Sequence, residues 1–305
     1  METIFVTVPA YEDPLLIDTV SNIFEKAENP DRVFVVVGLQ YRQIPYQIYS
    51  IHKNVATMMF DVNNRPGINF IRKQMLDNFN HDYLLMIDSH SDFASGWDSK
   101  IIQDYKELQA YKTSKVILSK PCSDMVGSLI DQDDMYDKEG VIWELRDAGS
   151  LWSDLYPFYG PRMDSKGLKF YWTGYTCCHF MFTDKHWVDQ VGISDVTRSY
   201  CEEPLLSYMS YASGWDVYAM PSYNHVAHLD KKYNISRYGA EYVDRKRKDF
   251  GLADTKDVMA KVHNYILNGT GDEFPTPLPN RDPKNFFSDI NLLDALPVLR
   301  DRFMV

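Results

Sequence analysis

The chain has 305 residues, of which 45% are hydrophobic and 25% are charged. This composition supports a full globular core and excludes a globally disordered or fibrous protein. No apolar run approaches the roughly 20 residues that a membrane span requires. The net charge of −11 argues against a protein that coats nucleic acid through bulk charge. The length allows one large domain or two ordinary ones.

The N-terminus and the cysteines indicate the cellular compartment in which we expect the protein. Residues 4–8 form a strand-like run, and no basic segment followed by an apolar one precedes them, so no secretory signal is visible. The four cysteines include the neighbours Cys177 and Cys178, which are too close for an ordinary disulfide, and there is no CxxC pair. We therefore expect a reduced, cytoplasmic protein.

In the first part of the chain, strand patterns alternate with helix patterns. Apolar and β-branched runs predict buried strands at residues 4–8, 33–39, 55–60, 83–87 and 115–118. Apolar residues at helical spacing predict helices at about 15–24, 66–79 and 97–111. This alternation predicts an α/β domain with a mostly parallel central sheet.

The alternation stops near residue 120. Residues 124–167 have no clear period, and we interpret them as an insertion or a substrate-facing loop region. A strand at 178–182, a helix at 202–212 and a strand at 217–220 follow. Residues 231–305 are helical around 240–250 and 255–267, which predicts a C-terminal helical extension after a domain of residues 1–230.

The clearest candidate for chemistry is Asp88-Ser89-His90, directly after the strand at 83–87. Ligands bind at strand ends in open α/β sheets. Residues two apart on an extended segment point to the same side, so Asp88 and His90 could hold one divalent cation such as Mn²⁺. A polar surface loop would show the same spacing, because two-ligand patterns are common.

Two further motifs carry acidic residues or histidines. Glu202 and Glu203 begin a predicted helix, where a carboxylate could orient or deprotonate an acceptor hydroxyl. Acidic residues also favour a helix N-terminus through the dipole alone. His225 and His228 follow a strand and are either a metal-ligand pair or one core and one surface histidine.

The end of the first strand, residues 9–14, lies where many α/β proteins hold a nucleotide. It contains neither GxGxxG nor GxxxxGK[ST], so it is not a dinucleotide or P-loop fingerprint. The alternative is a plain turn with Asp13 as the N-cap and Pro14 at the first helical position. A basic segment at 245–248 either holds phosphates or is the solvated face of a helix.

Taken together, these motifs resemble a known family. They run from the first strand with Pro9-Ala10-Tyr11, through Asp88-Ser89-His90 and Gly96-Trp97-Asp98, to Glu202-Glu203 and Gly214-Trp215-Asp216. The order is similar to that of the GlcNAc-transferase family, glycosyltransferase family 60, whose best-known member glycosylates a hydroxyproline on a cytosolic ubiquitin-ligase adaptor. That family is related to the mucin-type polypeptide GalNAc-transferases. The resemblance covers about residues 3–230.

The resemblance implies a GT-A, Rossmann-like, nucleotide-sugar-binding fold and a retaining, metal-dependent transfer. It implies that Asp88 and His90 hold Mn²⁺ or Mg²⁺ at the donor diphosphate, with His228 as the third ligand and His225 as the fallback. Glu202 or Glu203 matches the acidic pair that faces the reacting centre. The residues implied to bind the nucleotide-sugar donor, a UDP-linked sugar, are Pro9, Ala10, Tyr11, Asp13, Gln40, Arg72 and Ser89.

Some positions depart from the family pattern, and they fall near the sugar and the acceptor. Cys201 stands where the family has a glycine, and Asp230 and Lys231 replace an aromatic residue and an arginine. The expected acceptor is a protein hydroxyl or a hydroxymethylated DNA base, with no membrane partner. The alternatives are a non-catalytic nucleotide-sugar-binding protein and a metal-dependent hydrolase. The sequence indicates neither the sugar nor the oligomeric state.

Overall fold

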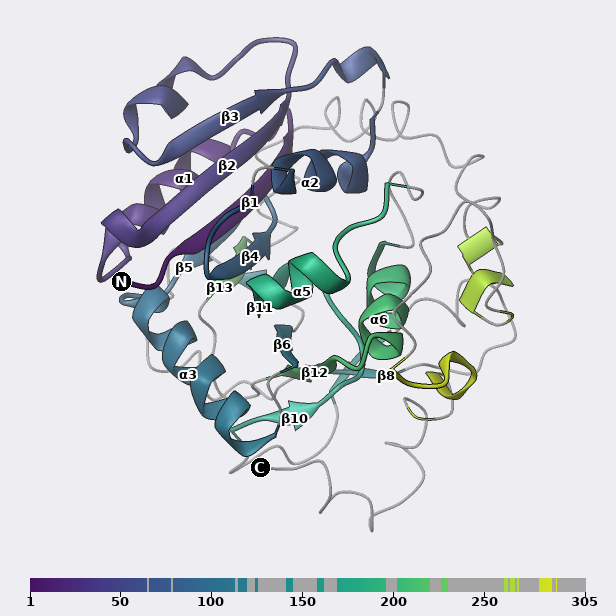
Figure 1. Cartoon of the computed structure of the whole chain (residues 1–305). Helices are drawn as coiled ribbons and strands as arrows, with labels where there is room; N and C mark the ends of the chain where they lie inside the picture. The colour runs from purple at the N-terminus through teal and green to yellow at the C-terminus, as the bar shows by residue number, and fades with distance from the viewer. Residues whose placement is uncertain are drawn as a thin grey trace.

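The computed structural model is shown in Figure 1. It describes residues 1–64, 66–77, 79–112, 115–119, 124–125, 141–144, 158–161, 169–195, 202–219, 226–229, 261–262, 264–266, 268, 280–286 and 289. Within this part of the chain, none of the helices is both long and apolar enough to cross a membrane.

An eight-stranded sheet forms the centre, in the order β10-β12-β6-β11-β4-β1-β2-β3. Its strands are β1 (Ile4–Tyr11), β2 (Val33–Gln40), β3 (Val55–Met59), β4 (Tyr83–Ile87), β6 (Val116–Ser119), β10 (Tyr171–Trp172), β11 (Phe180–Asp184) and β12 (Asp216–Ala219). The strands β3, β2, β1 and β4 run parallel, and so do β6 and β12. β11 is antiparallel to β4 and β6, and β10 to β12. The predicted α/β fold with a mostly parallel sheet is confirmed.

Helices connect these strands, and two small sheets lie beside them (Figure 1). The helices are α1 (Leu16–Glu25), α2 (Ile68–Leu76), α3 (Trp97–Tyr111), α5 (Lys185–Gln190) and α6 (Glu202–Ala212), with single 3-10 turns at Pro30–Arg32, Tyr46–Ser50, Val62–Asn64 and Pro283–Asn285. The first small sheet joins β5 (Ser91–Phe93), β13 (Val226–Leu229) and β7 (Asp124–Met125). The second pairs β8 (Val141–Glu144) with β9 (Phe158–Pro161).

The structure describes only parts of the two regions that were predicted in the later part of the chain. The region 124–167, expected to lack regular structure, contributes the strands β7, β8 and β9. The predicted helix at 240–250 and most of the one at 255–267 lie outside the described residues. Residues 261–262 and 264–266 are helical, in agreement with the second of these helices.

The central strands form because both of their faces are covered. All eight residues of β1 are buried, and the strand contributes to two apolar clusters. Ile4 and Val6 pack into the larger cluster with α1 and α3, whereas Phe5 packs into the smaller one with Trp187 of α5. A strand that buries both faces reads as a continuous apolar run, which is why the sequence pattern located it.

The strand β1 continues past Pro9 to Tyr11, beyond the predicted strand at residues 4–8. Pairing with β4 stops at Thr7, so beyond that point β1 keeps only β2 as a neighbour. A proline is tolerated where one side of a strand is unpaired, because its missing N–H then costs no ladder hydrogen bond. Ala10 and Tyr11 are therefore the last residues of a strand and not part of a turn.

A glycine allows α2 to lie close to the sheet. A Cβ atom on Gly38 of β2 would come within 2.3 Å of Cγ2 of Ile71 on α2. Only a residue without a side chain permits this approach. The next residue on α2 is Arg72, which is completely buried, so this contact fixes how far Arg72 reaches toward the ends of the central strands.

Candidate active site

Asp88 lies at the centre of a group of charged side chains at the end of β4. Its Oδ2 is 3.9 Å from Nε2 of His90 and 3.8 Å from Nε2 of His179. Its Oδ1 is 3.6 Å from a guanidinium nitrogen of Arg72. One fifth of the Asp88 side chain is exposed, so the carboxylate faces solvent while its neighbours hold it in place. The end of a strand in an open α/β sheet is the expected place for a ligand.

His90 is oriented by Asp13. Nδ1 of His90 lies 2.9 Å from Oδ2 of Asp13, and the Ser89 hydroxyl donates to the same oxygen at 2.6 Å. The other carboxylate oxygen of Asp13 accepts a hydrogen bond from the backbone N–H of Leu15. A carboxylate on one ring nitrogen fixes the imidazole and leaves the other nitrogen to a metal. The Nε2 atom of His90 is the one that faces Asp88.

The local structure around Asp13 differs from a simple helix cap. The helix α1 begins at Leu16, with Leu15 as its N-cap residue, so Asp13 and Pro14 belong to the preceding turn. In that turn Glu12 has a positive φ of 43°, which is uncommon for a residue with a side chain. The interpretation of Asp13 as a plain N-cap is wrong, because its carboxylate also holds Ser89 and His90.

Arg72 places a permanent positive charge behind Asp88. Its guanidinium donates to Oε2 of Glu202 at 2.9 Å and to the carbonyl of Cys178 at 3.3 Å. Burial alone would lower the pKa of Arg72, but Glu202, Cys178 and Asp88 raise it overall, so the residue stays charged. The structure thus places Arg72 beside Glu202 and Asp88, on the buried side of the site.

The two glutamates at the start of α6 have different neighbours. Glu202 pairs with Arg72, whereas Glu203 accepts from the backbone N–H of Cys178 at 2.9 Å. Burial raises the pKa of both carboxyls above the ordinary value, although Arg72 opposes the rise at Glu202 and His179 opposes it at Glu203. A carboxylate that is hard to ionise and lies beside a second charged group is typical of a functional site.

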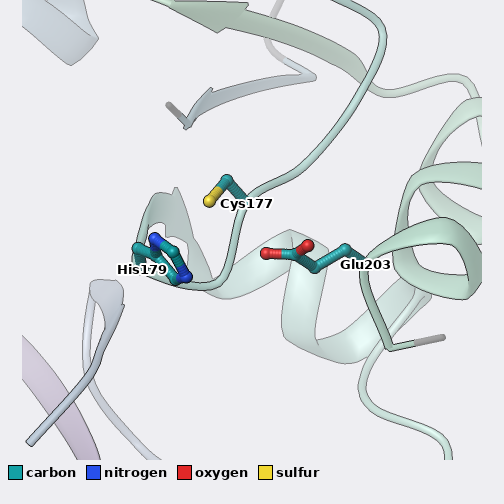
Figure 2. A group of neighbouring side chains, drawn as sticks. All are labelled: Cys177, His179 and Glu203. Atoms are coloured by element: carbon teal, nitrogen blue, oxygen red, sulfur yellow. The ribbon is translucent and has the colours of Figure 1, made fainter. Parts of the chain in front are cut away.

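Two residues of this group were missed from the sequence. Cys177 and His179 precede β11, and their side chains lie with Glu203 so that one ligand atom of each is within 4.8 Å of the others (Figure 2). The sequence offers one signal, a cysteine and a histidine two apart, which repeats the spacing of Asp88 and His90. The antiparallel register of β11 and β4 pairs Phe180 with Ile87, and this brings His179 beside Asp88.

The backbone of His228 lies close to His90. The strand β13 pairs with β5, and His228 is opposite Ser91, the residue after His90. Its side chain is outside the described structure, as are His225, Cys201 and the basic segment 245–248. The choice between His228 and His225 as the third metal ligand therefore stays a prediction, and the backbone register is compatible with His228.

The residues predicted to contact the nucleoside lie on adjacent strands. Tyr11 and Gln40 are register partners at the ends of β1 and β2, and both are buried. The side-chain oxygen Oε1 of Gln40 has no hydrogen-bond partner among the described residues. A buried acceptor without a donor is costly, and a ligand that carries an N–H group would satisfy it.

The geometry at Asp88 and His90 fits a divalent cation. Metal bonds to carboxylate oxygen and imidazole nitrogen are about 2.0–2.2 Å long, so two such ligand atoms are at most about 4.3 Å apart. The separation of 3.9 Å between Oδ2 of Asp88 and Nε2 of His90 is within this limit. The orientation of His90 by Asp13 and the partial exposure of Asp88 are further features of a metal-binding pair.

Comparisons with solved structures show the same fold in known transferases. S. aureus TarS 1–349 matches with a TM-score of 0.54 and 13% identity over 96% of this chain and 72% of that one. The same protein in complex with UDP-GlcNAc matches with a TM-score of 0.56 and 12% identity over 98% of this chain and 77% of that one. GalNAc-T7 with UDP, GalNAc and Mn²⁺ matches with a TM-score of 0.56 and 11% identity, but this chain spans only 58% of its length.

A comparison with curated proteins found no match. The model of the glycosyltransferase (GlcNAc) family matches residues 3–51 and 45–250, which is most of the chain. The match reaches residue 250, beyond the limit near residue 230 that the sequence motifs indicated. The chain therefore belongs to the glycosyltransferase (GlcNAc) family and is a glycosyltransferase with a GT-A fold.

Proposed function

We propose that this protein transfers a sugar from a UDP-linked donor to an acceptor hydroxyl, with the help of a divalent cation and with retention of configuration. The observation that carries the proposal is the convergence of Asp88 and His90 at the end of β4, with His90 oriented by Asp13. Family membership supports the sugar transfer. Solved structures of the same fold contain UDP-GlcNAc or UDP with Mn²⁺, which supports the choice of donor and metal.

The donor would lie across the ends of β1, β2 and β4. Gln40 offers its unpaired Oε1 to an N–H group of the base, and uracil carries such a group. Pro9, Ala10 and Tyr11 form the adjacent strand end. Arg72 is completely buried and its guanidinium contacts Glu202, so we propose that it sets the charge of the site from behind and does not touch the base.

Asp88 and His90, with His228 as the third ligand, would hold Mn²⁺ or Mg²⁺. The cation, when bound, would offset the negative charge that develops on the leaving nucleoside diphosphate. Asp13 and Ser89 act indirectly, because their side chains bind each other and Asp13 orients His90. We propose that both are positioning residues.

We propose different roles for Glu202 and Glu203. Glu202 neutralises Arg72, whereas Glu203 lies on the other side, next to His179 and the backbone of Cys178. Glu203 is therefore the better candidate to orient the acceptor hydroxyl as it attacks. A retaining transfer of this kind needs no covalent bond to the protein.

The test is UDP release from UDP-sugars with and without Mn²⁺, with products followed by mass. We expect turnover that requires the cation and falls on the order of 100-fold in Asp88→Asn, because a metal ligand is lost. Glu203→Gln is expected to lower turnover while UDP-sugar binding stays within about twofold. The control is Asp189→Asn, a change on the exposed part of α5. Cation-independent turnover, or full activity in Asp88→Asn, would contradict the proposal.

The same screen identifies the class of acceptor. Hydroxyl-bearing peptides and DNA containing hydroxymethylated bases are offered in parallel, and a hexose or N-acetylhexosamine is recognised by its mass. UDP release without any acceptor product would favour the hydrolase alternative. Donor binding without UDP release would favour the non-catalytic one.

A further inference from the structure

A second group of metal-ligating side chains lies beside Asp88 and His90, and the transfer reaction proposed above uses only one of its three members, Glu203. The group consists of Cys177, His179 and Glu203, and we propose that it is a binding site for a thiophilic divalent cation of the Zn²⁺ type. The site supplies one sulfur, one imidazole nitrogen and one carboxylate oxygen. This inference concerns metal binding alone and does not depend on the proposed sugar transfer.

The three side chains point toward a common space. Figure 2 shows the sulfur of Cys177, the ring of His179 and the carboxylate of Glu203 directed toward one another. Their ligand atoms all lie within 4.8 Å of one another. Bonds of about 2.3 Å to sulfur and 2.0–2.2 Å to nitrogen and oxygen would require these atoms to approach by about 1 Å, which side-chain rotation can supply.

Serine hydroxyls anchor the backbone of two of the three ligands, Cys177 and Glu203. The hydroxyl of Ser119 accepts from the N–H of Cys177 at 2.7 Å and donates to the carbonyl of the same residue at 3.1 Å. The Ser207 hydroxyl donates to the carbonyl of Glu203 at 2.6 Å, which anchors the first turn of α6. Ligands that are fixed before the metal arrives lose less conformational entropy when they bind it.

The chemistry of the three ligands selects the metal. Thiolate sulfur favours Zn²⁺ and other soft cations, whereas Mn²⁺ and Mg²⁺ favour oxygen ligands. Three protein ligands with an open fourth position are a common arrangement for Zn²⁺. The side chain of His179 is 27% exposed, and its Nε2 lies 3.8 Å from Oδ2 of Asp88. The site at Asp88 and His90 offers oxygen and nitrogen, whereas the group around Cys177 also offers sulfur. We therefore expect the two sites to select different metals.

The adjacent cysteine provides a matched control. Cys178 is also buried, but it packs with Met86, Met181 and Trp187 in the smaller apolar cluster. The two neighbouring cysteines therefore differ in role: we expect Cys177 to bind the metal and Cys178 to remain a core residue.

The experiment is a Co²⁺ titration of the full chain followed by near-ultraviolet absorption, with Zn²⁺ as the competitor. A cobalt–thiolate site gives a sulfur-to-metal charge-transfer band, which Zn²⁺ abolishes as it displaces Co²⁺. We expect the band in the unmodified protein, in Cys178→Ala and in His90→Ala, which lacks a ligand of the other centre. Cys177→Ser is expected to lose the band and to bind Zn²⁺ at least about 10-fold more weakly.

Three outcomes would overturn the proposal. The first is the absence of a charge-transfer band in the unmodified protein. The second is a band that persists in Cys177→Ser, since another cysteine would then be the ligand. The third is a band that is lost in Cys178→Ala while that variant stays folded, since the core cysteine would then be a ligand. Circular dichroism of each variant checks that it is folded, and Glu203→Gln, which keeps the thiol, is expected to keep the band with weaker binding.

Discussion

Arg72 shows how one buried residue organises the charges of the site. Its side chain is fully buried, and it contacts Glu202, Asp88 and the carbonyl of Cys178. A buried ion pair contributes little net stability when it replaces an apolar pair, but the loss of one partner leaves an uncompensated charge. Arg72 therefore keeps Glu202 and Asp88 together, and its loss alone would leave Glu202 without a compensating charge.

Replacement of Arg72 by methionine tests this role. We expect Arg72→Met to reduce the free energy of unfolding by about 3–5 kcal/mol, because Glu202 then stays buried without its partner. The double variant Arg72→Met, Glu202→Gln is expected to regain part of this loss, since the buried charge is also removed. Urea unfolding followed by tryptophan fluorescence measures all three proteins.

Lys73 supplies the control for that measurement. It follows Arg72 on α2, but it is 43% exposed and pairs with Asp195, which is 42% exposed. Exposed ion pairs contribute about 0–1 kcal/mol. Lys73→Met should therefore change stability by no more than this. Equal losses in the Arg72 and Lys73 variants would mean that the buried network has no special role.

The sequence located some residues of the site and missed others for a geometric reason. Asp88 and His90 are two residues apart, and this local spacing is visible in the sequence. His179 reaches the same place only because β11 runs antiparallel to β4 in one particular register. A shift by one residue would move every side chain of the strand to the other face, and no local pattern specifies that register.

At the scale of elements, long buried segments were predicted well and short ones were not. The helices α3 and α6 and the strand β4 have the predicted bounds. The strands β5, β10 and β13 have two to four residues each, which is too short to show a period. β13 nevertheless brings His228 opposite Ser91, so a short element decides where a predicted metal ligand lies.

The contact between β2 and α2 leads to a prediction about spacing. In Gly38→Ala the new methyl group would lie 2.3 Å from Cγ2 of Ile71, so α2 must move away from the sheet. Overpacking of this kind costs about 1–3 kcal/mol. Arg72 follows Ile71 and helps to hold the carboxylate of Asp88 in place, so a shift of α2 would disturb this metal ligand. We therefore expect Gly38→Ala to weaken Mn²⁺ binding severalfold, as measured by isothermal titration calorimetry.

The second-site variant Ile71→Ala removes the clashing Cγ2 atom. Gly38→Ala combined with Ile71→Ala should therefore bind Mn²⁺ more tightly than Gly38→Ala alone, even though the loss of Ile71 costs core packing. If the double variant were no better than the single one in Mn²⁺ affinity, the close approach of α2 would not be what positions Arg72.

At the scale of the whole molecule, the described residues after 260 pack against the rest of the fold. The sequence predicted a C-terminal helical extension at 231–305 after a domain of residues 1–230. In the described structure Val262, Tyr265 and Phe286 belong to the main apolar cluster. Arg281 also forms an ion pair of 2.8 Å with Asp216 at the start of β12. Composition and periodicity could not show this, because the packing joins residues far apart in the chain.

Phe286 is the residue through which this packing is best tested. Its ring packs edge-on against Tyr208 and at an angle against Tyr211, both on α6, which also carries Glu202 and Glu203. We expect Phe286→Ala to lower the free energy of unfolding by about 3–5 kcal/mol, the usual loss for a buried ring. Turnover should fall as well, because α6 loses a packing partner of Tyr208 and Tyr211. Replacement of the exposed neighbour Lys284 by alanine should leave both quantities unaltered. Urea unfolding and UDP release measure the two effects, and a Phe286→Ala protein as stable and active as the Lys284→Ala control would show that the packing of Phe286 does not support α6.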